Sequence, residues 1–246
     1  MRLKVLGSSS KGNCYILYND KESLLLECGV GFGEIKKGLN FNLRSVVGCL
    51  LTHEHGDHAK SIYDVLLSGI PVYASAGTHY ALSTSGNLSA RFVCDQQKFE
   101  AGSFRVMAFD VKHDCAEPLG FLINHPETGN VLFLTDTYYS QYRFSRLNNI
   151  LVEANYSKEI LKQKQELGLL PHILKDRVIQ SHMSIETCKE LLKANDLSQV
   201  NNIVLIHLSD GNSDEQMFRD QVSKLTGKTV HIADRGMDIE LNKTPF

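Results

Sequence analysis

Side chains that bind metal ions are concentrated in one short segment of the chain. His53, His55, Asp57 and His58 lie within six positions, directly after the apolar run 46–51. A buried strand that ends in this pattern can deliver two imidazoles to one metal ion, and a carboxylate and an imidazole to a second. The alternative is a solvated polar loop, but three of the chain's ten histidines lie here beside an aspartate. The segment therefore predicts a dinuclear hydrolase.

A two-metal site needs further ligands, and we expect them where other apolar strands end. His113 follows the run 104–111, Asp136 follows the run 131–135, and His207 follows the run 202–206. One histidine in such a place is more often an ordinary strand-end residue, but the repeated arrangement favours ligands. The other histidines lack this context, and we expect them to be structural: His79, His125, His172 and His231.

The elements that must position these residues follow from short apolar runs separated by Gly, Asn and Asp. The predicted strands are 3–6, 14–18, 23–27, 46–51, 71–74, 104–109, 120–123, 131–134, 150–152, 203–206, 230–232 and 237–241. The predicted helices are 32–39, 59–67, 158–167, 184–194 and 214–225. Strands and helices that alternate without a linker predict one layered α/β domain over residues 1–246.

Composition limits the class of protein. The 246 residues are 42% hydrophobic with a net charge of −2, so the chain can bury a core but has no basic surplus for a long nucleic-acid footprint. Six scattered cysteines without a CxxC pair predict reduced thiols and a cytoplasmic protein. No apolar run approaches the ~18 residues of a membrane span, and no signal sequence precedes the first strand, so we expect no membrane partner.

The order of the candidate ligands resembles that of the metallo-β-lactamase superfamily over nearly the whole chain. The resemblance implies an αββα sandwich, two mixed β-sheets flanked by helices, with a dinuclear metal site at the sheet edge. It also implies how the ligands divide. One ion is held by His53, His55 and His113, the other by Asp57, His58 and His207, and Asp136 bridges them. Two zinc ions are the usual occupants, although manganese and iron also occur in such sites.

The C-terminal half narrows the resemblance to ribonuclease-Z-like phosphodiesterases. Four segments look like the successive signatures of that branch: LVEAN at 151–155, SHMS at 181–184, IHLS at 206–209 and ADRGM at 233–237. The branch places a histidine equivalent to His182 at the phosphate and the leaving group. Ser184 and Glu153 are candidate substrate-binding residues, but Ser184 could instead only cap the next helix. Glu153 could orient His182 or pair with a backbone amide.

The N-terminal segment GSSSKGNC, residues 7–14, most resembles the YycJ/WalJ group and the phage anti-Pycsar phosphodiesterases that degrade cyclic nucleotides. It could equally be a tight turn with good hydrogen-bonding capacity. One departure from the superfamily is Glu27-Cys28-Gly29, where Asp-x-Gly is usual. The longer carboxylate raises a question about the residues that hydrogen-bond to the metal ligands and orient them. It does not change the predicted ligands themselves.

The resemblance predicts hydrolysis by a hydroxide that bridges the two metal ions. Asp57 would hold or accept the proton of this nucleophile, and protonated His182 would donate a proton to the departing ribose oxygen. Both residues are therefore the predicted catalytic groups.

Three classes of substrate compete. His113 follows His58 by only 55 positions, and the residues between them predict ordinary helix and strand rather than a protruding arm, which disfavours transfer-RNA maturation. The balanced charge favours a small cyclic mononucleotide as the substrate. An anti-Pycsar-like phage enzyme would hydrolyse this nucleotide in the host cytoplasm and so evade host immunity. Tyrosines within 138–142 could stack its base or pack at the surface.

The alternative is a YycJ/WalJ-like metal-dependent 5′–3′ exonuclease acting on DNA or RNA. A thioester or lactone hydrolase usually has glycines where this chain has Ala59-Lys60-Ser61.

The stretch 158–175 is an apolar-rich insertion between two of these signatures, with leucines at 161, 167, 169 and 170, Pro171 and Ile173. It could belong to the core. The resemblance to dimeric relatives implies instead a contact between the subunits of a homodimer.

Overall fold

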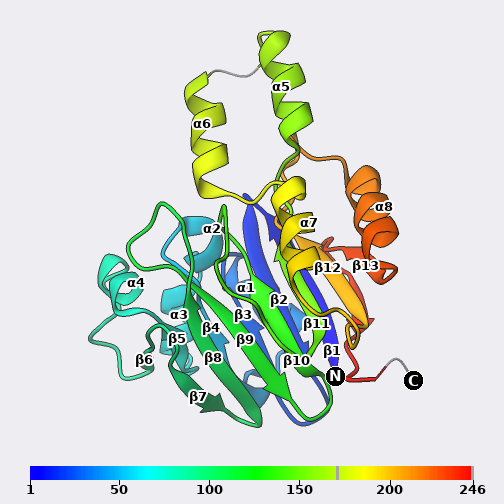
Figure 1. Cartoon of the computed structure of the whole chain (residues 1–246). Helices are drawn as coiled ribbons and strands as arrows, with labels where there is room; N and C mark the ends of the chain where they lie inside the picture. The colour runs from blue at the N-terminus through cyan, green and yellow to red at the C-terminus, as the bar shows by residue number, and fades with distance from the viewer. Residues whose placement is uncertain (170–171, 245–246) are drawn as a thin grey trace.

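Two seven-stranded β-sheets pack face to face, and helices flank the pair on its outer sides (Figure 1). The computed structural model describes residues 1–169 and 172–244, without the side chains of residues 172–175. Both sheets contain parallel and antiparallel neighbours. The prediction of two mixed sheets flanked by helices is confirmed.

The first sheet has the strand order β14-β1-β2-β3-β4-β5-β6. Its antiparallel part joins β14, β1, β2 and β3, and its parallel part runs from β3 to β6. The strands are Arg2–Ser9 (β1), Gly12–Tyr18 (β2), Ser23–Leu26 (β3), Val46–Leu50 (β4), Val72–Ala74 (β5), Ala90–Phe92 (β6) and Asp238–Glu240 (β14).

The second sheet has the strand order β13-β12-β11-β10-β9-β8-β7. Strands β10 to β13 are parallel, whereas β9 is antiparallel to both β8 and β10. The strands are Lys98–Ala101 (β7), Phe104–Asp110 (β8), Leu119–His125 (β9), Gly129–Leu134 (β10), Leu147–Glu153 (β11), Asn202–Ile206 (β12) and Thr229–Ile232 (β13).

The helices lie mainly in the connections on the outer faces. They are Phe32–Gly38 (α1), Gly56–Ala59 (α2), Ile62–Leu67 (α3), Ala76–Ala81 (α4), Lys158–Glu166 (α5), His172–Ser181 (α6), Ile185–Ala194 (α7) and Glu215–Thr226 (α8), with a short 3-10 turn at Leu43–Ser45. Ser184 and Asp214 cap α7 and α8, each accepting a hydrogen bond from a backbone N–H in the first turn.

Alternation along the buried strands builds three apolar layers. In β2, Tyr15 and Leu17 face the other sheet, whereas Cys14 and Ile16 face a helix layer with Ile35 of α1. The described helices leave the outer face of β7 to β9 uncovered (Figure 1), whereas α7 and α8 pack on the outer side chains of β10 to β13 in the same way. Burial of both faces explains why these strands have nearly continuous apolar sequences.

Strand direction brings the predicted ligands to one edge. Because β9 is antiparallel to both β8 and β10, β8 runs in the same direction as the parallel strands β10, β11 and β12. The residues that follow these strands therefore lie along one edge of the second sheet. The segment after β4 meets them there from the first sheet, as the contact of His53 with Asp136 shows.

Several elements differ from the sequence-based expectation. The helix expected over 59–67 is two helices, because Ser61 turns inward, where its N–H donates to Cys28 O and its hydroxyl to Val30 O. Helix α4 and the short strands β6 and β7 were not predicted. They are too short to show a clear period.

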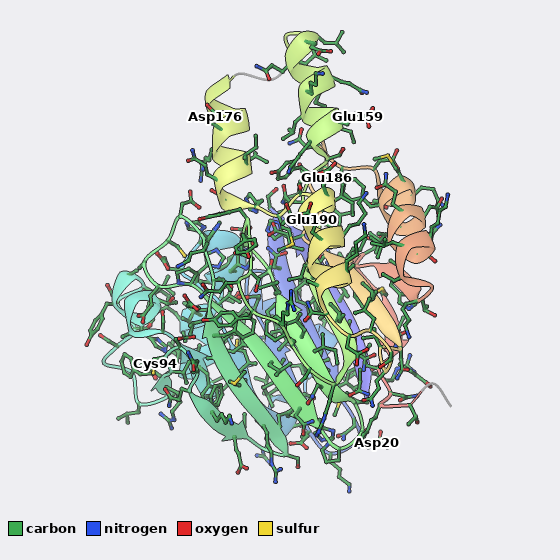
Figure 2. The ribbon with its side chains drawn as sticks, in the orientation of Figure 1. Asp20, Cys94, Glu159, Asp176, Glu186 and Glu190 are labelled. Carbon is green, nitrogen blue, oxygen red and sulfur yellow. The ribbon has the colours of Figure 1, made fainter. Side chains whose placement is uncertain are left out.

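The largest difference is the helical hairpin formed by α5 and α6, which rises above the sheets on the side of α2 (Figure 1). Its outer side chains, such as Glu159 and Asp176, lie away from the packed layers (Figure 2). A small apolar cluster of Tyr156, Leu161 and Val178 anchors it. The expected dimer contact includes Leu170 and Pro171, which lie outside the described residues, while Leu167 and Leu169 are exposed.

Two smaller expectations concern thiols and membranes. All six cysteines are free, and Cys14, Cys28, Cys49 and Cys188 are buried. In the described part of the chain, no helix is both long enough and apolar enough to cross a membrane.

Candidate dinuclear metal centre

The first group of candidate ligands consists of His53, His55 and His113, whose ligand atoms lie within 4.8 Å of one another. His53 and His55 follow β4, and His113 follows β8. His113 Nδ1 donates to the carbonyl of Ser181 at 2.8 Å, which leaves the lone pair of Nε2 directed inward. That nitrogen lies 3.1 Å from His55 Nδ1. Two imidazole nitrogens in this arrangement are suited to sharing one ion.

The second group consists of Asp57, His58 and His207, again with ligand atoms within 4.8 Å. Asp57 and His58 belong to the first turn of α2, and His207 follows β12. Asp57 Oδ2 lies 3.2 Å from His207 Nε2 and 3.4 Å from His58 Nε2.

Asp136 lies between the two groups. Its Oδ2 is 3.8 Å from His53 Nε2 and 3.3 Å from His58 Nε2, and its Oδ1 is 3.6 Å from His207 Nε2. A carboxylate in this position can bridge two ions. The structure thus brings all seven predicted ligands together, and their assignment to particular ions stays a prediction.

Buried polar groups hold the ligands from behind. Thr52 Oγ1 lies 2.8 Å from His53 Nδ1, and Asn155 Nδ2 lies 3.0 Å from His207 Nδ1. Glu27, fully buried, places Oε2 3.6 Å from His58 Nδ1. The longer carboxylate in Glu27-Cys28-Gly29 therefore still reaches a ligand, in keeping with the outer support that metal sites need.

Three residues at this edge adopt the left-handed conformation that non-glycine residues rarely use. Their φ angles are +65° at Glu27, +46° at Asp136 and +54° at His207, and each follows a buried strand. Such a conformation costs ~1–3 kcal/mol per residue and is found where the surrounding structure holds it in place, often at functional sites. No local pattern in the sequence signals it.

Electrostatics favours the metal-binding protonation state at the carboxylates and at two of the imidazoles. Burial acts to raise the pKa of Asp57 and of Asp136, but the neighbouring His58 and His207 outweigh it and hold both pKa values well below the usual range. Burial lowers the pKa of His53 and His113, which favours neutral imidazoles. Ionised carboxylates and neutral imidazoles are the protonation states that bind divalent metals. Burial acts to lower the pKa of His58 and His207 as well, but Asp136 outweighs it and raises both, so these two imidazoles must release a proton when a metal ion binds.

A second observation also indicates that these residues fit a pair of metal ions. His53 Nε2 is buried and, among the described residues, has no hydrogen-bond partner. A buried polar atom without a partner is costly, and a coordinated ion would satisfy it. Imidazole and carboxylate donors suit zinc, manganese or iron.

His182 lies beside the ligands, in the loop between α6 and α7. Its Nδ1 donates to Glu153 Oε1 at 2.7 Å, and Glu153 Oε2 accepts from the backbone N–H of Thr137 and of Met183. Both functions considered for Glu153, orienting His182 and pairing with backbone amides, are thus present. Burial acts to lower the pKa of His182, but Glu153 outweighs it and raises the pKa to about 9.

Neither candidate substrate-binding residue faces the open space. Glu153 is fully buried behind His182, and Ser184 is buried and accepts from Thr187 N at the start of α7. This placement favours positioning and capping over contact with a substrate.

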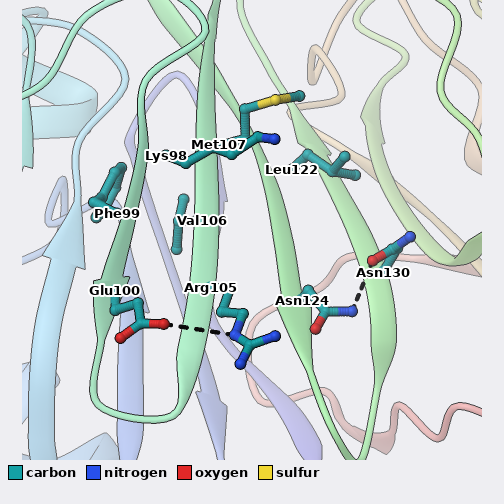
Figure 3. A pocket seen from close by; sticks show the side chains of 9 residues that line it. All are labelled: Lys98, Phe99, Glu100, Arg105, Val106, Met107, Leu122, Asn124 and Asn130. Carbon is teal, nitrogen blue, oxygen red and sulfur yellow. Dashed lines mark hydrogen bonds and ion pairs between the residues drawn. The ribbon is translucent and has the colours of Figure 1, made fainter.

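A cavity of about 340 Å³ opens over the candidate ligands. His55, Asp57, His113, Asp136, His182 and His207 line it, together with Ser10, Gly56 and Ser181 from the sequence motifs. Asp114 and Arg177 also line it, and the sequence did not single them out. A larger hollow of about 520 Å³ lies on the outer face of β7 to β10 (Figure 3). Its charged pair, Arg105 and Glu100, is exposed, and it lacks the convergent ligands of the first cavity.

The backbone at position 29 passes so close to the ligand segment that it requires glycine, which the sequence alone did not indicate. A Cβ atom at this position would lie 1.7 Å from the carbonyl oxygen of Asp57. The two backbones are tied together, since Cys28 N–H donates to His58 O and Ser61 N–H donates to Cys28 O. Only glycine permits this approach, and it sets the position of Asp57 and His58.

The chain belongs to the family described as the beta-lactamase superfamily domain, which matches residues 24–208. Among curated proteins, it is similar to exodeoxyribonuclease YycJ of Bacillus anthracis, with 29% identity over 92% of this chain and 89% of that protein. It is also similar to exodeoxyribonuclease WalJ of Streptococcus pneumoniae, with 28% identity over 88% of this chain and 84% of that protein.

A solved structure shows the same fold. The metallo-beta-lactamase fold protein YhfI of Bacillus subtilis superposes with a TM-score of 0.73 at 15% identity, covering 97% of this chain and 99% of that one. The predicted metallo-β-lactamase fold and the resemblance to the YycJ/WalJ group are confirmed, and so is the general prediction of a metal-dependent hydrolase. The particular resemblance to phage anti-Pycsar enzymes stays a prediction.

Proposed function

We propose that this protein is a metal-dependent exonuclease that hydrolyses the phosphodiester bonds of DNA or RNA from the 5′ end, with DNA as the first candidate. The observation that carries the proposal is the likeness, over most of both chains, to two proteins named exodeoxyribonucleases. The cluster of seven candidate ligands supports it, because two-metal sites suit phosphodiester hydrolysis. The 5′–3′ direction rests on the resemblance to the YycJ/WalJ group.

The names of these relatives favour the nucleic-acid alternative over a cyclic mononucleotide. The balanced charge that suggested a small substrate argues against a long footprint. It does not argue against an enzyme that holds only the end of a strand. The α5–α6 hairpin also supplies a protruding element, in a part of the chain where none was expected. Cyclic mononucleotide hydrolysis and immune evasion remain predictions to be tested beside it.

The proposed centre holds one ion on His53, His55 and His113 and another on Asp57, His58 and His207, with Asp136 between them. Zinc is the first candidate for both ions, and manganese the second. When bound, such ions activate water near neutral pH and neutralise charge on the phosphate. Glu27, Thr52 and Asn155 keep the imidazoles in place through the contacts described above.

Two side chains are proposed to move protons. Asp57 lines the cavity as an ionised carboxylate and can accept the proton of the attacking water. His182 is fixed through Nδ1 by Glu153, so its Nε2 is free to donate to the departing ribose oxygen. Its ring is only partly buried, with 22% of the side chain exposed, so a substrate can reach it.

The test compares purified protein loaded with Zn²⁺ or Mn²⁺ on four substrates: single-stranded DNA, single-stranded RNA, cyclic mononucleotides and bis(p-nitrophenyl) phosphate. DNA labelled at either end shows the direction, since a 5′ exonuclease releases the 5′ label first as a mononucleotide. We expect stepwise degradation of DNA. Cleavage of cyclic mononucleotides without DNA would restore the other prediction, and inactivity on all four would refute phosphodiester hydrolysis.

Two further attributes stay proposals. A homodimer through the 158–175 segment predicts twice the chain mass in light scattering, and the monomer mass would refute it. The free cysteines support a cytoplasmic location.

A further inference from the structure

Arg177, on α6, reaches the candidate active-site cavity from the protruding hairpin. It lines the cavity, and its Nε lies 3.9 Å from Asp114 Oδ2. Four residues later, on the same face of the helix, the carbonyl of Ser181 accepts from His113. The helix is thereby tied to a candidate ligand at its end, and Arg177 is held over the same opening.

The charge of Arg177 is unlike that of its surroundings. Among the described residues that line the cavity, it is the one side chain with a fixed positive charge, whereas Asp57, Asp114 and Asp136 carry carboxylates. Lys11 is near in sequence to Ser10, but it lines a neighbouring cavity and pairs with Asp210 at 2.5 Å. In the proposed centre, Asp57 and Asp136 would be neutralised by the metal ions that they hold, which leaves Asp114 to repel an anionic substrate unless a cation offsets it.

The position of Arg177 suits a phosphate beside the scissile one. The side chain is 71% exposed and contacts Asp114 rather than a ligand of the centre. At 3.9 Å this contact is longer than a hydrogen bond, so it orients the guanidinium and leaves its donors available. A guanidinium presents five N–H donors in a planar fork that matches phosphate geometry.

We propose that Arg177 binds the phosphate next to the scissile bond, and so selects a polynucleotide strand over a mononucleotide. The inference rests on the proposed nuclease function and names the feature of the substrate that the site recognises. A mononucleotide ester has one phosphate, which lies at the metal centre, and it gains nothing from Arg177. A strand gains one charge-assisted contact.

The experiment compares wild-type protein with Arg177→Ala and Arg177→Lys, and uses Arg219→Ala as a control. Arg219 is exposed on α8 and outside the cavity lining, so its removal changes the net charge equally. Steady-state kinetics are measured on a single-stranded DNA oligonucleotide and on thymidine 5′-(p-nitrophenyl phosphate). For Arg177→Ala, the ratio of kcat/KM between strand and ester should fall about tenfold or more, the scale of one charge-assisted hydrogen bond. The loss should fall mainly on KM, and Arg177→Lys should lie between.

A second measurement separates phosphate binding from a structural role. Binding of a phosphorothioate strand, followed by fluorescence anisotropy at several salt concentrations, counts the phosphates that the protein neutralises. The slope of log K against log salt should become shallower by about 0.7 in Arg177→Ala, the value for one phosphate of a single strand. Arg219→Ala should keep the wild-type slope.

The outcomes distinguish this inference from the proposed function. If wild-type protein degrades the strand while Arg177→Ala keeps its KM and its salt slope, Arg177 has no such role and the nuclease function stands. If wild-type protein cleaves the ester but neither binds nor degrades the strand, both proposals are refuted. A melting temperature for Arg177→Ala equal to that of Arg219→Ala ensures that a loss is not unfolding.

Discussion

Gly29 packs closely against the segment that carries Asp57 and His58. The substitution Gly29→Ala, which adds a single methyl group, therefore tests whether this contact positions the candidate ligands. In Gly29→Ala, the new Cβ would lie 1.7 Å from Asp57 O and 2.8 Å from His58 N. Real Cβ atoms stay at least 3.0 Å from such atoms, so residue 29 and the Asp57 carbonyl must separate by 1.3 Å or more. Movement is resisted, because the hydrogen bonds from Gly29 N–H to Asn13 O and from Cys28 N–H to His58 O tie the loop on both sides.

A shift of that size exceeds what a metal site tolerates. Ligand distances in protein sites vary by about ±0.2 Å, and a misplacement of about 1 Å can cost 10²-fold in activity. We therefore expect Gly29→Ala to lose metal, most of all from the site with Asp57 and His58, and to lose about 10²-fold or more of its turnover. Overpacking should lower the free energy of unfolding by about 1–3 kcal/mol.

Metal content by elemental analysis, turnover of bis(p-nitrophenyl) phosphate and thermal unfolding measure the three effects. Gly31→Ala and Gly33→Ala are matched controls, because a Cβ at either position meets no atom within 4 Å. Both should keep full metal and activity. A Gly29→Ala protein with two metal ions per chain and wild-type turnover would show that the close approach does not position the centre, and the reasoning would fail.

Three further predictions concern other parts of the molecule. Asp136→Ala should bind fewer metal ions by elemental analysis, because the proposed bridge is lost; undiminished metal content would contradict the bridge. His182→Ala should keep its metal but lose about 10²-fold in turnover of a DNA strand, and much less with a p-nitrophenyl ester, whose leaving group needs no proton; equal losses on both would exclude the acid role. Burial acts to raise the pKa of Asp238, but hydrogen bonds from Tyr18 and Arg2 outweigh it and keep the pKa below its usual value. The stability gained is present above pH about 4 and is lost as pH falls through the lower folded-state pKa, so the melting-temperature difference between wild type and Asp238→Asn should shrink in acid.

Local sequence was sufficient for most of the strands and for the types of the candidate ligands. Buried strands alternate between two apolar layers, so runs such as 24–26 and 131–134 are apolar throughout. Helix α7 shows its period and its cap within a few residues, and Ser184 does cap it. The hairpin was missed beyond α5 because the apolar cluster that anchors it has three members among the described side chains, which leaves little periodic pattern in α6.

The sequence by itself determined which side chains could bind metal and that they follow apolar strands. Only the tertiary structure decided that they meet. His53, His113 and Asp136 are far apart in the chain, and their convergence depends on strand direction in two different sheets. The left-handed backbone at Asp136, the contact of Gly29 with Asp57 and the reach of Arg177 into the cavity likewise come from distant neighbours. Local patterns record burial and propensity, whereas a site is a set of distances between segments that the chain order does not contain.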